Sequence, residues 1–194
     1  MRLLMVAPPG AGKGTQATRL SGHYGIAHLS SGDLLRKEVA AGTAIGRIAA
    51  GYLSRGDLVP DDLVMQMLVS PVRRAVESGG YVLDGFPRTV RQAEEAYAWA
   101  RQEGGVELTA VVHLVVARDE LRRRMLARAA TEGRTDDTAE TIDHRLDVYD
   151  RETEPLIDYY SGRGLVVDID GGKGIDDVFE DIVASIESVR SGRS

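Results

Sequence analysis

Residues 6–15 of the chain read VAPPGAGKGT and connect an apolar run to a segment with a helical pattern. Glycines allow successive backbone N–H groups to point inward, and such groups beside a helix N-terminus form a binding site for anions. Lys13 can reach the phosphates of a bound nucleotide, and Thr15 or a neighbouring water can serve a magnesium ion. The stretch therefore predicts a phosphate-binding loop between a strand and a helix.

This loop departs twice from the common pattern G-x-x-x-x-G-K-[ST]. Ala7 stands where the pattern has its first glycine, and Gly14 separates Lys13 from the hydroxyl of Thr15. The loop is therefore a variant of the pattern, and other parts of the chain must indicate which variant it is.

Short apolar runs alternate with helical patterns along the chain, which indicates right-handed crossover connections. The run at residues 110–116 is apolar on both faces, as expected of a strand in a parallel sheet that is covered on both sides. We therefore predict an α/β fold with a doubly wound, five-stranded parallel sheet. The expected strands are residues 3–6, 26–29, 81–83, 110–116 and 165–169. The expected helices are residues 15–24, 33–41, 61–78, 89–103, 119–129, 138–160 and 175–190, with Pro71 kinking or splitting the third.

Two segments read as insertions between core elements of a single domain over residues 1–194. Residues 30–59 are mostly helical in pattern, whereas residues 129–137 form a polar loop.

The composition narrows the classes of protein and partner. Hydrophobic residues make up 43% of the 194 residues, which is enough for a sizeable core, and no apolar stretch approaches the length of a membrane span. The net charge of −6 argues against nucleic acid as the main partner. The chain has no cysteine, which excludes disulfides and cysteine-ligated zinc. We expect a soluble cytoplasmic protein with no membrane and no nucleic-acid partner.

Two further stretches suggest parts of a nucleotide site. Residues 81–88 read YVLDGFPR, so Asp84 ends an apolar strand and is expected beside the phosphate loop, where it can hold magnesium through water. Residues 29–36 read LSSGDLLR, which by itself indicates only a capped helix start.

Taken together, residues 6–15, the sequence DGFPR at 84–88 and Gln92 resemble the adenylate kinase family of nucleoside monophosphate kinases, and the resemblance runs from one end of the chain to the other. In that family a hydroxyl follows the additional glycine, as Thr15 follows Gly14, while Ala7 remains a departure. The resemblance implies reversible transfer of the terminal phosphoryl group of Mg·ATP to AMP, giving two ADP, directly and without a covalent intermediate.

The resemblance also implies a role for individual residues. The implied catalytic residues are Lys13, Arg88, Arg128, Arg134 and Arg145. The implied ATP-binding residues are Gly10, Ala11, Gly12, Lys13, Gly14, Thr15, Arg124, Arg128 and Lys173. The implied AMP-binding residues are Ser31, Arg36, Asp57, Leu58, Val59, Gly85, Phe86, Pro87, Arg88, Gln92, Arg134 and Arg145. Thr15, Asp33 and Asp84 would serve Mg²⁺, mainly through water.

The two insertions acquire names from the same resemblance. Residues 30–59 would form the subdomain that binds the nucleoside monophosphate. Only residues 129–133 separate Arg128 from Arg134, so residues 129–137 would form a short lid without zinc. We expect a monomer with ATP, AMP and ADP as its partners.

Two alternatives remain open at this point. UMP/CMP kinase also has a short lid and the sequence GFPR, but its signature continues with asparagines, whereas this chain has Thr89, Gln92 and Ser31 and contains no asparagine. A non-catalytic P-loop nucleotide-binding module is the other alternative, although it would be expected to lack Lys13 or several of the arginines.

Overall fold

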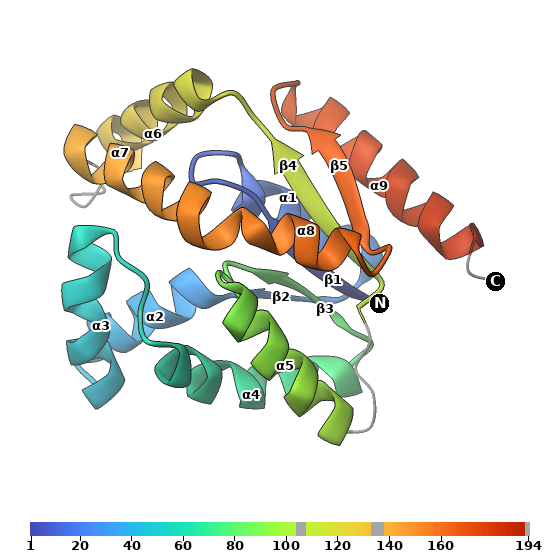
Figure 1. Cartoon of the computed structure of the whole chain (residues 1–194), viewed down its shortest axis with the longest axis horizontal. Helices are drawn as coiled ribbons and strands as arrows, with labels where there is room; N and C mark the ends of the chain where they lie inside the picture. Colours follow the sequence, from blue (N-terminus) through green and yellow to red (C-terminus); the bar gives the residue numbers. More distant parts are fainter. Residues whose placement is uncertain (104–107, 133–137, 193–194) are drawn as a thin grey trace.

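The computed structural model describes residues 1–103, 108–132 and 138–192. At its centre lies a five-stranded sheet in the order β2-β3-β1-β4-β5, in which every pair of neighbours is parallel (Figure 1). The strands are β1 (Arg2–Val6), β2 (Ala27–Ser30), β3 (Tyr81–Asp84), β4 (Ala110–Val115) and β5 (Val166–Asp170). The predicted five-stranded parallel α/β fold is confirmed.

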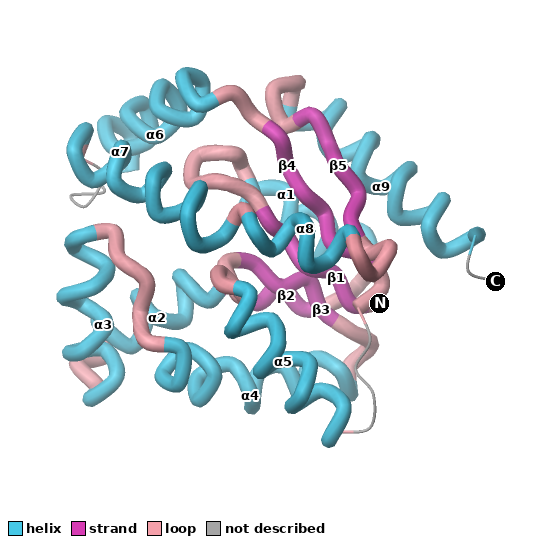
Figure 2. The backbone as a smooth tube through the Cα atoms, in the orientation of Figure 1, coloured by secondary structure: helices cyan, strands magenta, loops and turns pink. Residues whose placement is uncertain are grey.

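Helices connect the strands. They are α1 (Lys13–Tyr24), α2 (Ser31–Ala40), α3 (Ala44–Arg55), α4 (Asp61–Glu77), α5 (Val90–Gln102), α6 (Arg118–Glu132), α7 (Ala139–Val148), α8 (Pro155–Ser161) and α9 (Ile175–Gly192). A π-helical turn, η1 (Tyr149–Thr153), joins α7 to α8. Figure 2 shows α2 and α3 on one side of the loop that follows β1, and α6 and α7 on the other.

Apart from shifts of one or two residues at the ends of elements, three features differ from the sequence-based expectation. Residues 138–160 form three pieces rather than one helix, because the chain widens to a π-helical turn and starts again with Pro155 in the first turn of α8. Helix α4 continues through Pro71 without splitting. Helix α6 continues to Glu132, so the first part of the predicted loop 129–137 is helical; residues 133–137 lie outside the described residues.

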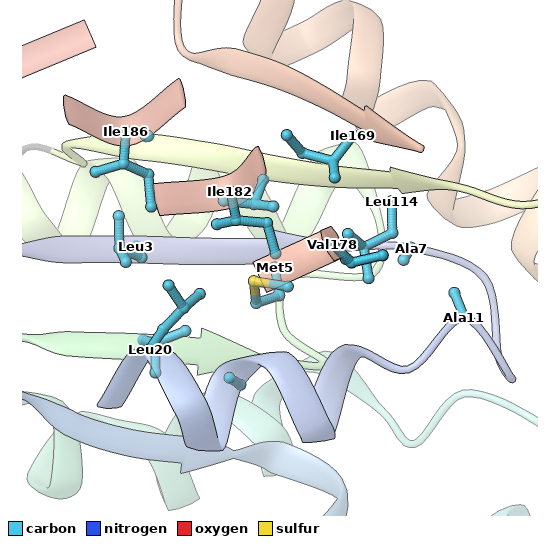
Figure 3. Close-up of a cluster of buried hydrophobic side chains, with 14 of the residues drawn as sticks. Leu3, Met5, Ala7, Ala11, Leu20, Leu114, Ile169, Val178, Ile182 and Ile186 are labelled. Atoms are coloured by element: carbon cyan, nitrogen blue, oxygen red, sulfur yellow. The ribbon is translucent and has the colours of Figure 1, made fainter. Parts of the chain in front are cut away.

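Alternate residues of β1 face opposite layers of the structure, as expected for a strand with a side-chain period of two. Leu3 and Met5 join a cluster that contains residues of α1 and α9, such as Leu20 and Ile182 (Figure 3). Leu4 and Val6 join a second cluster that contains residues of α4, α5 and α8. Both faces of the sheet are therefore buried, which explains the continuous apolar character of its strands.

The insertion between β2 and α4 is a pair of helices in close contact. Thr43 caps α3 by accepting a hydrogen bond from the N–H of Gly46 at 3.0 Å, and its hydroxyl also donates to Glu38 Oε2 in α2 at 2.6 Å. A β-carbon placed on Gly46 would overlap the carbonyl group of Glu38. The absence of a side chain at Gly46 is thus what allows α2 and α3 to approach.

We predict that Gly46→Ala lowers the free energy of unfolding by about 1–3 kcal/mol, because the added methyl group must push α3 away from α2. Gly51→Ala is the matched control in the same helix, since its added carbon would lie 3.5 Å from the side chain of Arg55 and meet no backbone. That control should raise the free energy of unfolding by about 0.5–1 kcal/mol. Urea unfolding followed by circular dichroism measures both variants, and equal effects would contradict the tight contact.

Candidate functional site

The loop after β1 is shaped by two glycines with left-handed backbone conformations. Gly10 has φ 86° and Gly12, which caps the N-terminus of α1, has φ 89°. A β-carbon on Gly10 would come within 2.8 Å of Met125 Cγ and 2.9 Å of the carbonyl oxygen of Leu121. The loop therefore needs glycine at this position for both conformation and space.

Ala7 does not disturb this geometry. Its side chain is buried in the cluster between the sheet and α1, where Figure 3 shows it beside the start of the loop. Every residue with positive φ in the described part of the chain is a glycine, so Ala7 adopts a backbone conformation that is ordinary for alanine. The departure from the common pattern thus fills a core position and leaves the anion-binding turn intact.

Lys13 lies at the first position of α1 and turns back over the loop. Its Nζ donates to the carbonyl oxygens of Ala7 at 2.6 Å and Pro8 at 3.2 Å. Burial lowers the pKa of Lys13 to about 8; the carboxylate of Asp84 opposes this shift, and the charges of Arg88 and Arg128 add to it. Lys13 therefore stands among one carboxylate and two guanidinium groups, and an arriving anion would find a concentration of positive charge.

Asp84 reaches this site from the end of β3. It lies opposite Met5 in β1 and opposite Ser30 in β2 in the sheet register. A β-carbon on Gly14 would lie 3.8 Å from Asp84 Oδ2, so the carboxylate faces the first turn of α1. The register of the parallel sheet thus brings the two motifs, separated by some seventy positions in the sequence, to one place.

A pocket opens next to Asp84, between α2, the end of α3, and the start of α5. Ser31, Gly85, Arg88 and Gln92 form its polar side, and the segment 57–59 closes it. Its complete lining is Ser31, Leu35, Leu53, Asp57, Leu58, Val59, Val64, Gly85, Arg88 and Gln92. Most of these residues were predicted to bind AMP, and they come from four separate segments.

Hydrogen bonds hold the polar side of the pocket in shape. The carbonyl oxygen of Gly85 accepts from Ser31 Oγ at 2.7 Å and from Arg88 Nε at 2.8 Å. Gly85 itself has φ 79°, and a β-carbon there would meet Ser31 Oγ at 2.7 Å. The carbonyl oxygen of Arg88 accepts from Thr153 Oγ1 at 2.8 Å, which ties the pocket to η1. Arg88 is thereby fixed along its backbone and its side chain.

The charges around Arg88 favour an anion. Burial lowers the pKa of Arg88; Asp84 opposes the shift, and the like charges of Arg145 and Arg36 reinforce it. Guanidinium groups stay protonated at all ordinary pH values, so their mutual repulsion remains in the free protein and is relieved when an anion binds between them.

The comparisons with known proteins agree with this geometry. Residues 5–165 match the family model described as adenylate kinase. The chain belongs to the adenylate kinase family. It is 46% identical over 190 residues to the adenylate kinase of Micrococcus luteus, covering 98% of this chain and 92% of that protein. It is also 46% identical over 186 residues to the adenylate kinase of Kocuria rhizophila, covering 96% of this chain and 98% of that protein. The identity to the adenylate kinase of Stenotrophomonas maltophilia is 44% over 188 residues, covering 97% of this chain and 100% of that protein.

Some residues that the adenylate kinase resemblance implicated do not line the pocket in this conformation. Phe86 and Pro87, which are joined by a cis peptide bond, line a separate apolar cavity and not the pocket itself. Arg36 is exposed and forms an ion pair with Asp33. Burial alone would raise the pKa of the Asp33 carboxyl, but the hydrogen bond and charge of Arg36 lower it overall.

On the other side of the phosphate loop, Arg124 packs against the connection after β5. Its NH1 donates to the carbonyl oxygen of Gly171 at 3.0 Å, and its Nε donates to Glu120 Oε1 at 2.7 Å. Lys173 directs its side chain to Asp181 in α9 at 2.7 Å, which raises the pKa of Lys173. In this conformation the ion pair keeps the side chain of Lys173 on α9. Arg134 lies outside the described residues.

Sequence reasoning missed the partners that hold the predicted residues. Asp57 accepts from His144 Nε2 at 2.9 Å and from Arg55 Nε at 2.8 Å, and these two hydrogen bonds lower the pKa of Asp57. Arg145 NH2 donates to the carbonyl oxygen of Leu53 at 3.3 Å. No local sequence signal pairs Asp57 with His144 or Arg145 with Leu53, because 87 and 92 positions separate them.

The lowered pKa of Lys13 can be tested by comparing its reactivity with that of Lys173, because the chain has only three lysines. We predict that acetylation of Lys13 by acetic anhydride, followed by mass spectrometry, has a midpoint near pH 8, whereas Lys173 reacts only at much higher pH. Asp84→Asn should move the Lys13 midpoint to lower pH, because Asp84 supports the charged form. A Lys13 midpoint that matches that of Lys173 would contradict the described environment.

Proposed function

We propose that this chain transfers the terminal phosphoryl group of Mg·ATP reversibly to AMP and forms two ADP, by direct in-line transfer without a covalent intermediate. One observation carries the proposal: the phosphate loop with Lys13, Asp84, Arg88 and Arg128 adjoins the pocket formed by the predicted AMP-binding residues. Two nucleotide sites that share a cluster of cations suit a reaction in which one polyanion attacks another.

The chemistry requires positioning and charge stabilisation more than proton transfer. A phosphate monoester has a second pKa of roughly 6, so the AMP phosphate is mostly dianionic at neutral pH and needs no general base. The obstacle is the repulsion between two polyanions. Fixed guanidinium and ammonium groups remove it, and they also stabilise charge on the phosphoryl group during transfer.

Lys13 and the loop amides would hold the donor phosphates. The carbonyl oxygens of Ala7 and Pro8 keep the ammonium group at the loop in the free protein. An arriving polyphosphate offers stronger acceptors than these carbonyls, because its oxygens carry negative charge that attracts the ammonium group. Anion binding also favours the protonated lysine, so its pKa rises when the nucleotide binds.

The arginines would divide between the two nucleotides. Arg88 is fixed by Gly85 and Gln92 at the mouth of the pocket, where it can hold the AMP phosphate together with Arg36 and Arg145. The charge of Arg128 in α6 lowers the pKa of Lys13, which supports the proposal that Arg128 contacts the transferring group. Arg134 is assigned with Arg128 by resemblance alone.

The bases of the two nucleotides would lie on opposite sides of the loop. The AMP base would occupy the pocket beside Ser31, Gln92 and the segment 57–59. The ATP base would lie against Arg124 and the connection that contains Lys173, which Arg124 already contacts at Gly171.

The residues present fit a magnesium ion bound mainly through phosphate oxygens and water. Asp84 presents a carboxylate to the first turn of α1, where Thr15 is exposed. Within the described residues no group of three or more histidine, cysteine, aspartate or glutamate side chains is arranged to hold a metal, and Mg²⁺ typically takes only one or two protein carboxylates when it arrives with a nucleotide. The ion would neutralise part of the negative charge of the nucleotide phosphates. Asp33 pairs with Arg36 through one carboxylate oxygen and could reach this shell through water.

The insertions would serve the two substrates. We propose that residues 30–59 form the AMP-binding subdomain of a single P-loop kinase domain over residues 1–194, and that residues 129–137 act as its lid. Hydrogen bonds of Asp57 and Leu53 with α7 connect this subdomain to the helix that carries Arg145. No helix in the described ranges is both long and apolar enough to cross a membrane. The monomeric state and the cytoplasmic location stay predictions.

The alternative of UMP/CMP kinase is less well supported. The relatives reported above are all adenylate kinases, and Gln92 lies in the pocket where a base would bind. A coupled assay that offers AMP, CMP, UMP and GMP with Mg·ATP tests the proposal directly. Preferential use of AMP is the expected result, whereas preferential use of CMP or UMP would reject it.

Lys13→Met should reduce turnover by at least about tenfold while the fold stays intact, because it removes a cation from the transferring phosphoryl group and keeps the length of the side chain. Circular dichroism checks the fold, and the coupled assay measures turnover. Arg122→Ala is a control for loss of one positive charge, since Arg122 is exposed and pairs with Asp143. Near-normal turnover of Lys13→Met would remove Lys13 from the proposed mechanism.

Arg88→Ala should raise KM for AMP much more than KM for ATP, because Arg88 lines the pocket and not the opposite side of the loop. Initial rates with each nucleotide varied in turn measure both constants. An equal loss for the two nucleotides would contradict the assignment of this pocket to AMP.

A further inference from the structure

Asp61, the first residue of α4, contacts the one amide side chain in the lining of the pocket. Its Oδ1 accepts a hydrogen bond from Gln92 Nε2 at 2.6 Å. On its other side, Arg91 Nε lies 3.8 Å from Asp61 Oδ2. The side chain of Asp61 is 23% exposed, whereas that of Arg91 is 75% exposed. The carboxylate is thus largely enclosed between Gln92 and a surface cation.

The amide of Gln92 is held at both ends. Its Oε1 accepts from the backbone N–H of Arg88 at 2.7 Å, while its Nε2 donates to Asp61. A backbone N–H only donates and a carboxylate only accepts, so a single orientation of the amide satisfies both neighbours. Gln92 is 2% exposed, and the reversed amide would face two repulsive contacts without water to relieve them.

This fixed amide retains one donor and one acceptor for a ligand. Nε2 has a second hydrogen, and Oε1 has a second lone pair. Adenine offers a ring-nitrogen acceptor next to its 6-amino donor, which is the pattern complementary to a carboxamide. Guanine and hypoxanthine have an oxygen at position 6, so the same pose would set that oxygen against Oε1. A 6-oxo purine would match the amide only if the amide reversed.

We propose that Asp61 is a positioning residue that makes the pocket selective for a 6-aminopurine by preventing reversal of the Gln92 amide. The inference rests on the proposed function, because it concerns the base of the acceptor nucleotide. Arg88 resists reversal through its backbone N–H, which substitution of a side chain leaves in place. Of the two groups that hold the Gln92 amide, only the Asp61 carboxylate can therefore be removed by mutagenesis.

The test compares Asp61→Asn with Asp62→Asn, using AMP and IMP as acceptors with Mg·ATP. Both aspartates lie in the first turn of α4, where a negative charge interacts favourably with the helix dipole, but Asp62 is exposed. Asp61→Asn should reduce the ratio of kcat/KM for AMP to that for IMP by about tenfold, mainly through a higher KM for AMP, because a charge-assisted hydrogen bond is lost. Asp62→Asn should leave the ratio unchanged.

A second pair of variants separates positioning from general stability. In a Gln92→Leu background, Asp61→Asn should have no further effect on the ratio, because Asp61 acts through Gln92. Asp61→Glu keeps the charge at the helix N-terminus but displaces the acceptor, and should reduce the ratio even if Asp61→Asn is too unstable to measure.

The outcomes distinguish the two proposals. If the unaltered protein phosphorylates neither AMP nor IMP, the proposed function fails and this inference fails with it. If the unaltered protein uses AMP but both Asp61 variants keep its AMP-to-IMP ratio, the proposed function stands and the role of Asp61 is rejected. An equal effect of Asp61→Asn with and without Gln92 would also reject it.

Discussion

The interaction on which the site depends is the approach of Asp84 to the loop that carries Lys13. The carboxylate supports the charge of a buried ammonium group, while Arg88 and Arg128 oppose it. The parallel register of β1 and β3 imposes this arrangement, since Met5 and Asp84 are direct neighbours in the sheet. Sheet pairing therefore fixes the distance between Asp84 and the loop, and with it one of the charges that set the pKa of Lys13.

The pocket that contains Ser31, Gly85, Arg88 and Gln92 begins at the same edge of the sheet. Gly85 follows Asp84 directly, and its carbonyl oxygen accepts from both Ser31 and Arg88. A backbone group can receive two side chains here only because Gly85 has no side chain of its own. The pocket and the phosphate loop are therefore adjacent parts of one site. The pocket continues the hydrogen-bonded edge that begins at the phosphate loop, so two nucleotides bound there would meet at the arginines.

Long-range contacts give the helical insertion a defined position. Asp57 binds His144, and Arg145 binds the carbonyl oxygen of Leu53, so α7 contacts the segment that closes the pocket. The lowered pKa of Asp57 means that this carboxylate is charged at neutral pH. An arginine proposed to bind phosphate thus also touches the insertion, which offers a physical route by which phosphate binding and subdomain position could influence one another.

The pattern of residues along the chain was enough to predict the fold class and the anion-binding loop. Apolar strands alternating with helices can bury both faces only in a covered parallel sheet, and a glycine-rich turn with Lys13 binds anions by virtue of its backbone. Tertiary structure alone decided that residues 138–160 break into three helical pieces, that Lys173 turns toward Asp181, and that Asp61 holds Gln92. The local sequence shows which polar side chains are present but not what they contact. The partner of a polar side chain is set by packing between distant segments, because a hydrogen bond requires a distance and an angle that only the assembled chain supplies.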